Sequence, residues 1–228
     1  MTTASNKFRV LALVFVLLVG FHASKVAADF ESGLSFLQSP ADTSSCRDGI
    51  ETRVEELEGL VERGRRLLDE QQEGSILREV NLFFYRYIQL ATDSRIWGRG
   101  DYWATPADTL CVGSGDTEDF AIAKYFALAE IGIPEDRLRL TYAQSTWFGP
   151  VVVLLYYAPD GGTRVLHYRD IWDLQEVAGR RLLHPVYAVN DQTLWKVSHA
   201  WRFTPLNDAK GMKLWQEVLR RTRPGRQN

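Results

Sequence analysis

Hydrophobic residues recur every three or four positions between about residues 48 and 73, where charged residues fill the remaining positions. This spacing predicts an amphipathic helix with one buried face and one solvated charged face. The hydrophobic positions are Val54, Leu57, Leu60, Val61, Leu67 and Leu68. A second, more apolar helix is predicted from Ser75 to Ala91, with Ser75 as its cap.

A third helix is predicted from Glu118 to about Ile131, after a long segment rich in turn residues and tryptophan. Gly132 and Pro134 follow it, and both residues are typical of a helix end. A last amphipathic helix is predicted from about Asp208 to Thr222.

Between the last two helices the hydrophobic pattern changes to that of strands. Residues 137–145 alternate between polar and apolar, and residues 150–157 form a β-branched and aromatic run. A glycine-rich turn at 160–162 predicts a hairpin with 163–168, and residues 184–190 and 193–198 predict another. Helices followed by antiparallel strands indicate an α+β fold, with no internal repeat.

The N-terminus has the pattern of a secretory signal. Lys7 and Arg9 precede an apolar run from Val10 to Phe21, which is shorter than the roughly 20 residues of a membrane-spanning helix. We therefore expect a signal peptide at 1–28, a flexible leader at 29–47 and one domain at 48–228. The expected location is periplasmic or secreted, with no integral membrane segment after cleavage; an uncleaved anchor is the alternative.

Charge and cysteine content narrow the picture further. The formal net charge of −2 gives no reason to expect nucleic acid as a partner. Cys46 and Cys111 could pair in an oxidising compartment, but two cysteines do not define a disulfide framework. Small buried or loop thiols are the favoured interpretation.

The stretch "GDTEDF" at residues 115–120 carries the candidate chemistry. It reads as a sharp turn into a helix, with Asp116, Glu118 and Asp119 crowded around Thr117. Such carboxylates can bind a cation, and they also cap a helix and favour its positive end. The pattern alone leaves an active site, a metal site and a well-capped helix open.

The segment from "REVNLFFYRYIQLATDSRIWGRGDYWATP" through "GDTEDFAIAKYF" to "RLRLTY" resembles the bacterial transglutaminase-like cysteine proteinases. Their best-known members are LapG-type periplasmic proteases that release biofilm adhesins. The resemblance continues through "VVVLLYY", "HPVYAVNDQTLW" and "LWQEVLRR". It implies a transglutaminase-like or papain-like fold, in which N-terminal helices pack on an antiparallel sheet or barrel.

The resemblance also shows where the catalytic residues would stand. The family pattern at the helix start is Gly-Asp-Cys-Glu-Asp, so Thr117 occupies the cysteine position. Counting from the tyrosine pair places Val151 at the histidine position, to within one residue, and His167 at the aspartate position. A thiolate nucleophile needs a cysteine and a base, so these residues imply an inactive homologue.

Two catalytic alternatives stay open from the sequence. Thr117 could be served by His167, which Asp170 or Asp173 would orient, although His167 would hold the orienting rather than the base position. The chain would then be an active peptidase that cuts a periplasmic or surface protein. A transferase of the transglutaminase type ranks last, because it needs the same thiol chemistry.

The family's calcium site has its counterpart in Asp116 and Glu118, with Asp136 expected near the third position. By the same resemblance, the expected role is a binding or regulatory module connected with adhesin release and biofilm control. Its partner would be a surface adhesin segment or an inner-membrane receptor. Trp147 and Phe148 could anchor that partner, or could simply pack at the end of a hairpin.

Overall fold

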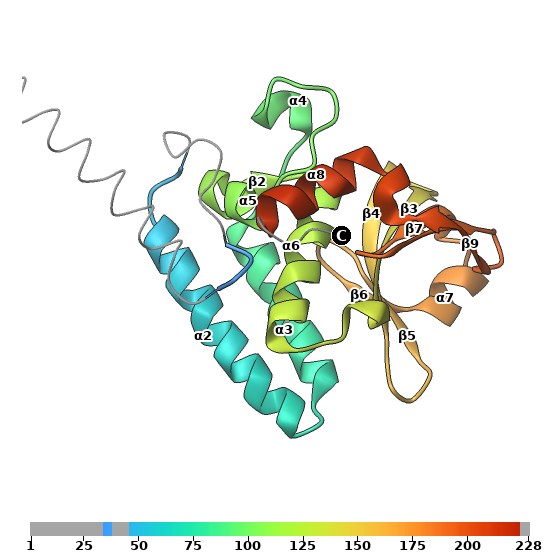
Figure 1. Ribbon diagram of the computed structural model, residues 1–228, viewed down its shortest axis with the longest axis horizontal. Coiled ribbons are helices and arrows are strands. Elements are labelled where there is room, and N and C mark those ends of the chain that lie inside the picture. Colours follow the sequence, from blue (N-terminus) through green and yellow to red (C-terminus); the bar gives the residue numbers. More distant parts are fainter. Residues whose placement is uncertain (1–33, 38–45, 224–228) are drawn as a thin grey trace, which may run out of the picture.

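Helices cover one side of a curved sheet in the computed structural model, which describes residues 34–37 and 46–223 (Figure 1). Most helices of this layer precede the strands of the sheet in the chain. The last helix follows the strands and packs back onto the same layer. Its helices are α2 (Ile50–Asp69), α3 (Glu73–Tyr87), α4 (Asp93–Ile96), α5 (Pro106–Val112), α6 (Thr117–Ile131) and α8 (Lys213–Thr222). Helices first and strands later confirm the predicted α+β fold.

The sheet has seven antiparallel strands in the order β6-β5-β4-β3-β7-β8-β9. Their bounds are β3 (Leu138–Ser145), β4 (Gly149–Tyr157), β5 (Thr163–Leu166), β6 (Ile171–Asp173), β7 (Leu183–Val189), β8 (Thr193–Val197) and β9 (Phe203–Asp208). A separate parallel pair joins β1 (Gln89–Leu90) to β2 (Ser114–Gly115). This small pair lies beside the turn that leads into α6.

The two faces of the sheet bury different hydrophobic clusters, because side chains alternate along each strand. On β4, Val152 and Leu154 pack against the helical layer, in the same cluster as α6. Val151 and Val153 belong to the cluster on the opposite face, which α7 (Leu174–Gly179) covers through Val177. The side of β4 that a residue occupies therefore decides whether it can meet α6.

The long periodic elements were predicted, and the short ones were missed. The second helix, α3, begins at Glu73 after Gln72, so Ser75 lies inside it rather than capping it, and it ends at Tyr87 because residues 89–90 form β1. Helix α6 ends at Gly132 in a left-handed conformation, as the sequence indicates. Helices α5 and α7 and strand β6 are too short to show a period. The predicted final helix begins at Lys213 rather than Asp208, because residues 203–208 form the edge strand β9.

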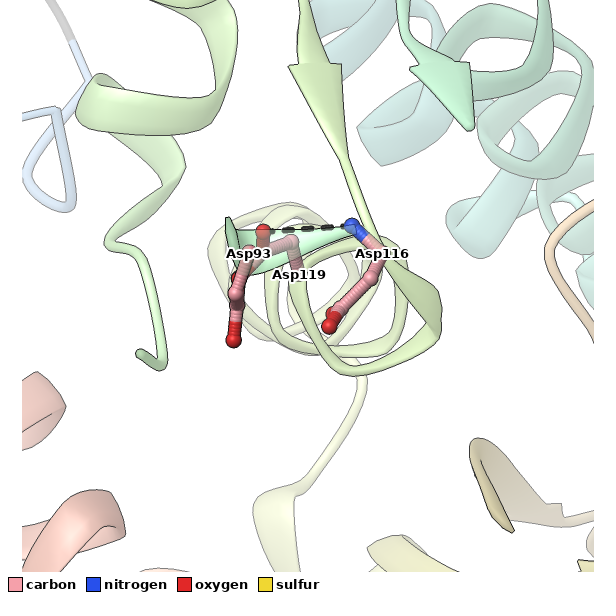
Figure 2. Close-up of side chains that lie close together, drawn as sticks. All are labelled: Asp93, Asp116 and Asp119. Atoms are coloured by element: carbon pink, nitrogen blue, oxygen red, sulfur yellow. Dashed lines mark hydrogen bonds between the residues drawn. The ribbon is translucent and has the colours of Figure 1, made fainter. Parts of the chain in front are cut away.

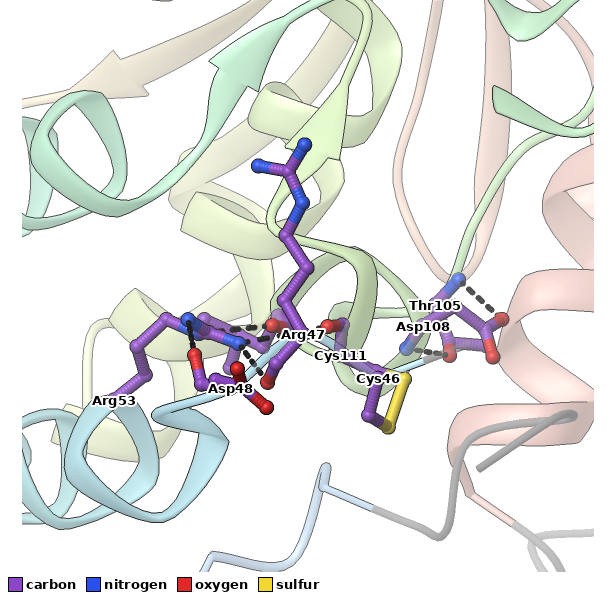
Figure 3. Close-up of a disulfide and its surroundings, with 8 residues drawn as sticks. Cys46, Arg47, Asp48, Arg53, Thr105, Asp108 and Cys111 are labelled. Atoms are coloured by element: carbon purple, nitrogen blue, oxygen red, sulfur yellow. Dashed lines mark hydrogen bonds between the residues drawn. A yellow bond between two sulfur atoms is a disulfide. The ribbon is translucent and has the colours of Figure 1, made fainter. Parts of the chain in front are cut away.

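A disulfide between Cys46 and Cys111 corrects the interpretation of these residues as free thiols (Figure 3). It links the chain just before α2 to the end of α5, across a sequence separation of 65 residues. Arg53 of α2 reinforces this junction, because its guanidinium donates to the carbonyl oxygens of Leu110 and Asp48.

The expected flexible leader is partly packed on the core. Leu34, Phe36 and Leu37 are buried, and the Phe36 ring stacks on Phe126 of α6 with centroids 6.3 Å apart. The expected signal peptide at 1–28 lies outside the described residues. In the two described segments, no helix combines the length and the apolar character needed to cross a bilayer.

Candidate functional site

The turn into α6 is a capping box built from two aspartates. Asp116 caps the helix, its side chain accepting a hydrogen bond from the Glu118 N–H at 3.2 Å. Asp119 reaches back and accepts from the Asp116 N–H at 3.3 Å. Gly115 permits this approach, since a Cβ there would lie 2.7 Å from the Asp119 Cβ. The helix-cap interpretation of "GDTED" is therefore confirmed.

The same turn also gathers carboxylates from three parts of the chain. Asp93, Asp116 and Asp119 each offer an oxygen within 4.8 Å of the others (Figure 2). Asp93, Asp101 and Glu118 form a second, overlapping group. The parallel pair β1–β2 brings α4 and its Asp93 beside Asp116.

Burial makes the charged forms of these carboxylates unfavourable. It raises the pKa of Asp116 to about 10, with the negative charges of Asp119 and Glu118 contributing. Burial also raises the pKa of Asp119, which is fully buried, although N–H groups of Ala104 and Asp116 donate to it. Asp93 is buried as well, and its Oδ1 has no hydrogen-bond partner in the structure. A cation would relieve all three.

Asp136 does not belong to this group. It lies in the 3-10 turn η2 (Glu135–Arg137), beyond the C-terminal end of α6. Asp116 caps the other end of the same 15-residue helix, which is about 22 Å long. The structure therefore places Asp136 away from the acidic turn and brings Asp93 and Asp101 to it, and their separation from Asp116 in sequence gave no signal of this.

The hydroxyl of Thr117 is engaged both as a hydrogen-bond acceptor and as a donor. It accepts a hydrogen bond from the Val152 backbone N–H at 3.0 Å and donates to the Glu118 carboxylate at 3.0 Å. Val152 is thus the β4 residue that meets Thr117, whereas the side chain of Val151 lies on the opposite face of the sheet. Neither position offers a base.

His167 lies just after β5, on the face of the sheet away from α6. Its ring stacks on Trp172, which packs in the cluster of that face, with centroids 4.9 Å apart. Tyr168 comes next and lies on the α6 face, where its ring is 5.9 Å from that of Phe120. Burial lowers the pKa of His167 to about 4, so the imidazole is neutral at pH 7. Its place and its stacking make it part of the core.

Lys124 of α6 holds the loop that contains these two residues. Its ammonium is fully buried and donates to the His167 carbonyl oxygen and to Asn81 Oδ1, both at 2.6 Å. Burial lowers the pKa of Lys124 to about 7. The loop after β5 is therefore fixed relative to α6 by a side chain two turns from Thr117.

Trp147 and Phe148 lie at the tip of the β3–β4 hairpin and are 66% and 70% exposed. They border a cavity of about 240 Å³ that Trp172, His167 and Leu183 also line. Arg169 and Asp170 lie at the same cavity and pair with each other at 3.1 Å. The aromatic side chains at the hairpin tip are thus exposed rather than packed, beside a cavity that also has one ion pair in its lining.

Helices packed on an antiparallel sheet, with an Asp-X-Glu-Asp turn at the start of a buried central helix, define a protein with the transglutaminase-like fold. The model of the bacterial transglutaminase-like cysteine proteinase family matches residues 55–169, and the chain belongs to that family. No curated protein sequence matches it.

Solved structures of Legionella pneumophila LapG are similar to this chain. The EGTA-treated form is 30% identical, covers 79% of this chain and 93% of its own, and has a TM-score of 0.63. The calcium-bound form is 30% identical, covers 78% of this chain and 94% of its own, and has a TM-score of 0.61.

Proposed function

We propose that this protein is an exported, non-catalytic member of its family that binds Ca²⁺ and engages a partner polypeptide without cutting it. The state of Thr117 carries the proposal. Its oxygen accepts one hydrogen bond and its proton is directed at a carboxylate, and no histidine in the described segments is among its partners. A hydroxyl needs a positioned general base to become a nucleophile, and the histidine that serves this role in the family is absent from the described partners of Thr117. The Cys46–Cys111 bridge supports export, because disulfides persist in oxidising compartments.

The acidic turn fits a calcium ion. Carboxylate oxygens are the ligands that Ca²⁺ prefers, and Asp93 supplies a buried oxygen that no donor of residues 34–37 or 46–223 satisfies. We assign the ligands to the two overlapping groups that share Asp93: one adds Asp116 and Asp119, and the other adds Glu118 and, at the exposed side, Asp101. The ion would neutralise the buried carboxylates and fix α4 against the start of α6. The existence of a calcium-bound form of LapG agrees with this assignment.

Calcium is expected to raise the melting temperature of this protein, and Asp93→Asn is expected to weaken that response. A ligand at about 100 times its Kd stabilises a native state by about 2.7 kcal/mol. The matched control is Asp136→Asn, which removes an equal charge at the far end of α6. Thermal melts with calcium and with chelator measure the effect. An unchanged melting temperature in wild type, or equal losses in both variants, would contradict the site.

The pH dependence of stability gives an independent measurement. The pKa of Asp116 is about 10 in the folded state and near 3.8 in the unfolded chain, so the folded state binds more protons between these values. The free energy of unfolding of the metal-free protein is therefore expected to fall as pH rises from 5 to 9. Bound calcium would displace the proton of Asp116, so the free energy of unfolding should depend less on pH when calcium is present. Denaturant titrations at several pH values test it.

For the partner, we propose an apolar segment of a surface adhesin or of an inner-membrane receptor, docked at the hairpin tip. Exposed aromatic residues beside a cavity are typical anchors of an interface. Trp147→Ala is expected to weaken capture of such a segment about 30-fold, the effect of losing a strong anchor. Leu82→Ala, which truncates an exposed residue on α3, serves as the matched control.

An active peptidase is the competing function, and the contact between Thr117 and Glu118 is the observation in its favour. Incubation of the purified protein with N-terminal adhesin fragments separates the two functions. We expect the fragments to stay intact at high protein concentration, while a pull-down recovers them or the receptor. Cleavage that Thr117→Ala abolishes would establish the peptidase, and recovery of neither partner would count against the binding role.

A further inference from the structure

A pair of histidines lies away from the acidic turn, at the end of the sheet where β7 begins. The rings of His184 and His199 have centroids 5.6 Å apart and are inclined by 76°. His184 pairs in register with Gln144 of β3, and His199 lies in the turn between β8 and β9. If the register of the β7–β8 hairpin is continued, the two histidines stand directly across from each other.

The backbone holds both residues in place. His184 lies between the paired positions Leu183 and Pro185 of β7. The turn that carries His199 is closed by hydrogen bonds from the Ser198 N–H to the Arg202 carbonyl at 3.0 Å and from the Trp201 N–H to the Ser198 carbonyl at 2.8 Å. Two imidazoles on fixed backbones lose little conformational entropy when they bind one ligand together.

The ring nitrogens of this pair are available. Within the part of the chain that the structure describes, neither ring donates or accepts a hydrogen bond. His184 is half-buried and His199 is exposed, so solvent reaches the space beside them. In contrast, the imidazole of His167 is buried and stacked on Trp172. The pair thus has the donors of a metal site without a competing protein partner.

We propose that His184 and His199 form a site for a divalent transition-metal ion, ligated by one nitrogen from each imidazole and by water. Imidazole suits Cu²⁺, Zn²⁺ and Ni²⁺, and affinity for nitrogen ligands is highest for Cu²⁺. Calcium prefers oxygen ligands and does not compete there. The site is distinct from the acidic turn, because β3 separates β7 from the strand that contacts Thr117.

Titration of the protein with Cu²⁺ and Zn²⁺ by calorimetry tests the site, in excess Ca²⁺ and without a histidine tag. We expect one ion per chain. The affinity should be at least about tenfold lower in both His184→Gln and His199→Gln, because even the loss of a residue that only orients a ligand costs about that much. Their metal-free melting temperatures should equal that of wild type. Asp93→Asn is the control for binding at the acidic turn, and it should leave the titration unchanged.

The location of the ion provides a second measurement. Substoichiometric Cu²⁺ should broaden the NMR signals of residues around His184 and His199, and leave those around Asp116 sharp. No saturable binding by wild type would overturn the proposal. So would binding that survives in both histidine variants, or one ion for two chains with dimer formation, which would place the ion between copies.

Discussion

Thr117→Cys combined with Val152→His is expected to give a thiol that is alkylated about tenfold faster at pH 6 than the thiol of Thr117→Cys alone. The Val152 N–H already contacts the Thr117 hydroxyl, so an imidazole at this position can reach a sulfur at residue 117. A neighbouring imidazolium lowers a thiol pKa from about 8.5 toward 6, which raises the thiolate fraction roughly 100-fold. The lower nucleophilicity of the more acidic thiol offsets about a factor of ten.

The measurement is clean because Cys46 and Cys111 form a disulfide, which leaves one free thiol in the variant. Iodoacetamide alkylation followed by mass spectrometry gives the rate against pH. The matched control is Thr117→Cys with Val151→His, which places the imidazole on the opposite face of the sheet. Equal acceleration in the control would show that Val151 faces residue 117. Thr117→Cys alone is expected to leave adhesin fragments uncut, since no base is supplied.

The two double variants place the histidine at neighbouring positions, 151 and 152. The sequence alone could not decide which of these positions faces residue 117. Five of the seven strands of the sheet, β4 among them, could be predicted from composition and alternation, and β6 and β9 could not. The face on which a given residue lies changes with a shift of a single residue. Aligning tyrosine pairs pointed to Val151, whereas the contact with Thr117 selects Val152. Likewise, His167 lies on the far face of the sheet, and its neighbour Tyr168 lies beside Phe120.

The candidate metal site also contains residues that could be predicted from the sequence and residues that could not. Asp116 and Glu118 are adjacent to the helix start, so their proximity could be predicted from local sequence. Asp93 reaches the same turn because β1 pairs with β2, and each of these strands has two residues. Such short strands have no recognisable period. The segment of Asp101 is held there by the Tyr102 N–H, which donates to Asp93. Asp136 looked suitable because it follows the helix, yet a helix carries its two ends apart.

The junction between α2 and α5 helps to position the acidic turn. The disulfide and Arg53 hold the last residues of α5, and Gly113 then turns the chain into β2 and the acidic turn (Figure 3). Arg53 is itself buried, and its guanidinium is held by backbone carbonyl oxygens rather than by a carboxylate. The covalent link therefore acts together with the buried apolar side chains of Leu110 and Ala107 at this junction.

Replacing both Cys46 and Cys111 with serine is expected to lower the free energy of unfolding by about 4 kcal/mol, the loop-closure contribution for the 65-residue separation. The melting temperature should then fall by about 8 to 16 °C. Denaturant titration and calorimetry measure both quantities. Reducing agent should shift wild type by the same amount and leave the double variant unchanged, because a serine pair has no bond to break. If the free energy of unfolding of wild type does not change with reducing agent, and the double variant is as stable as wild type, then α5 is held by Arg53 and packing alone.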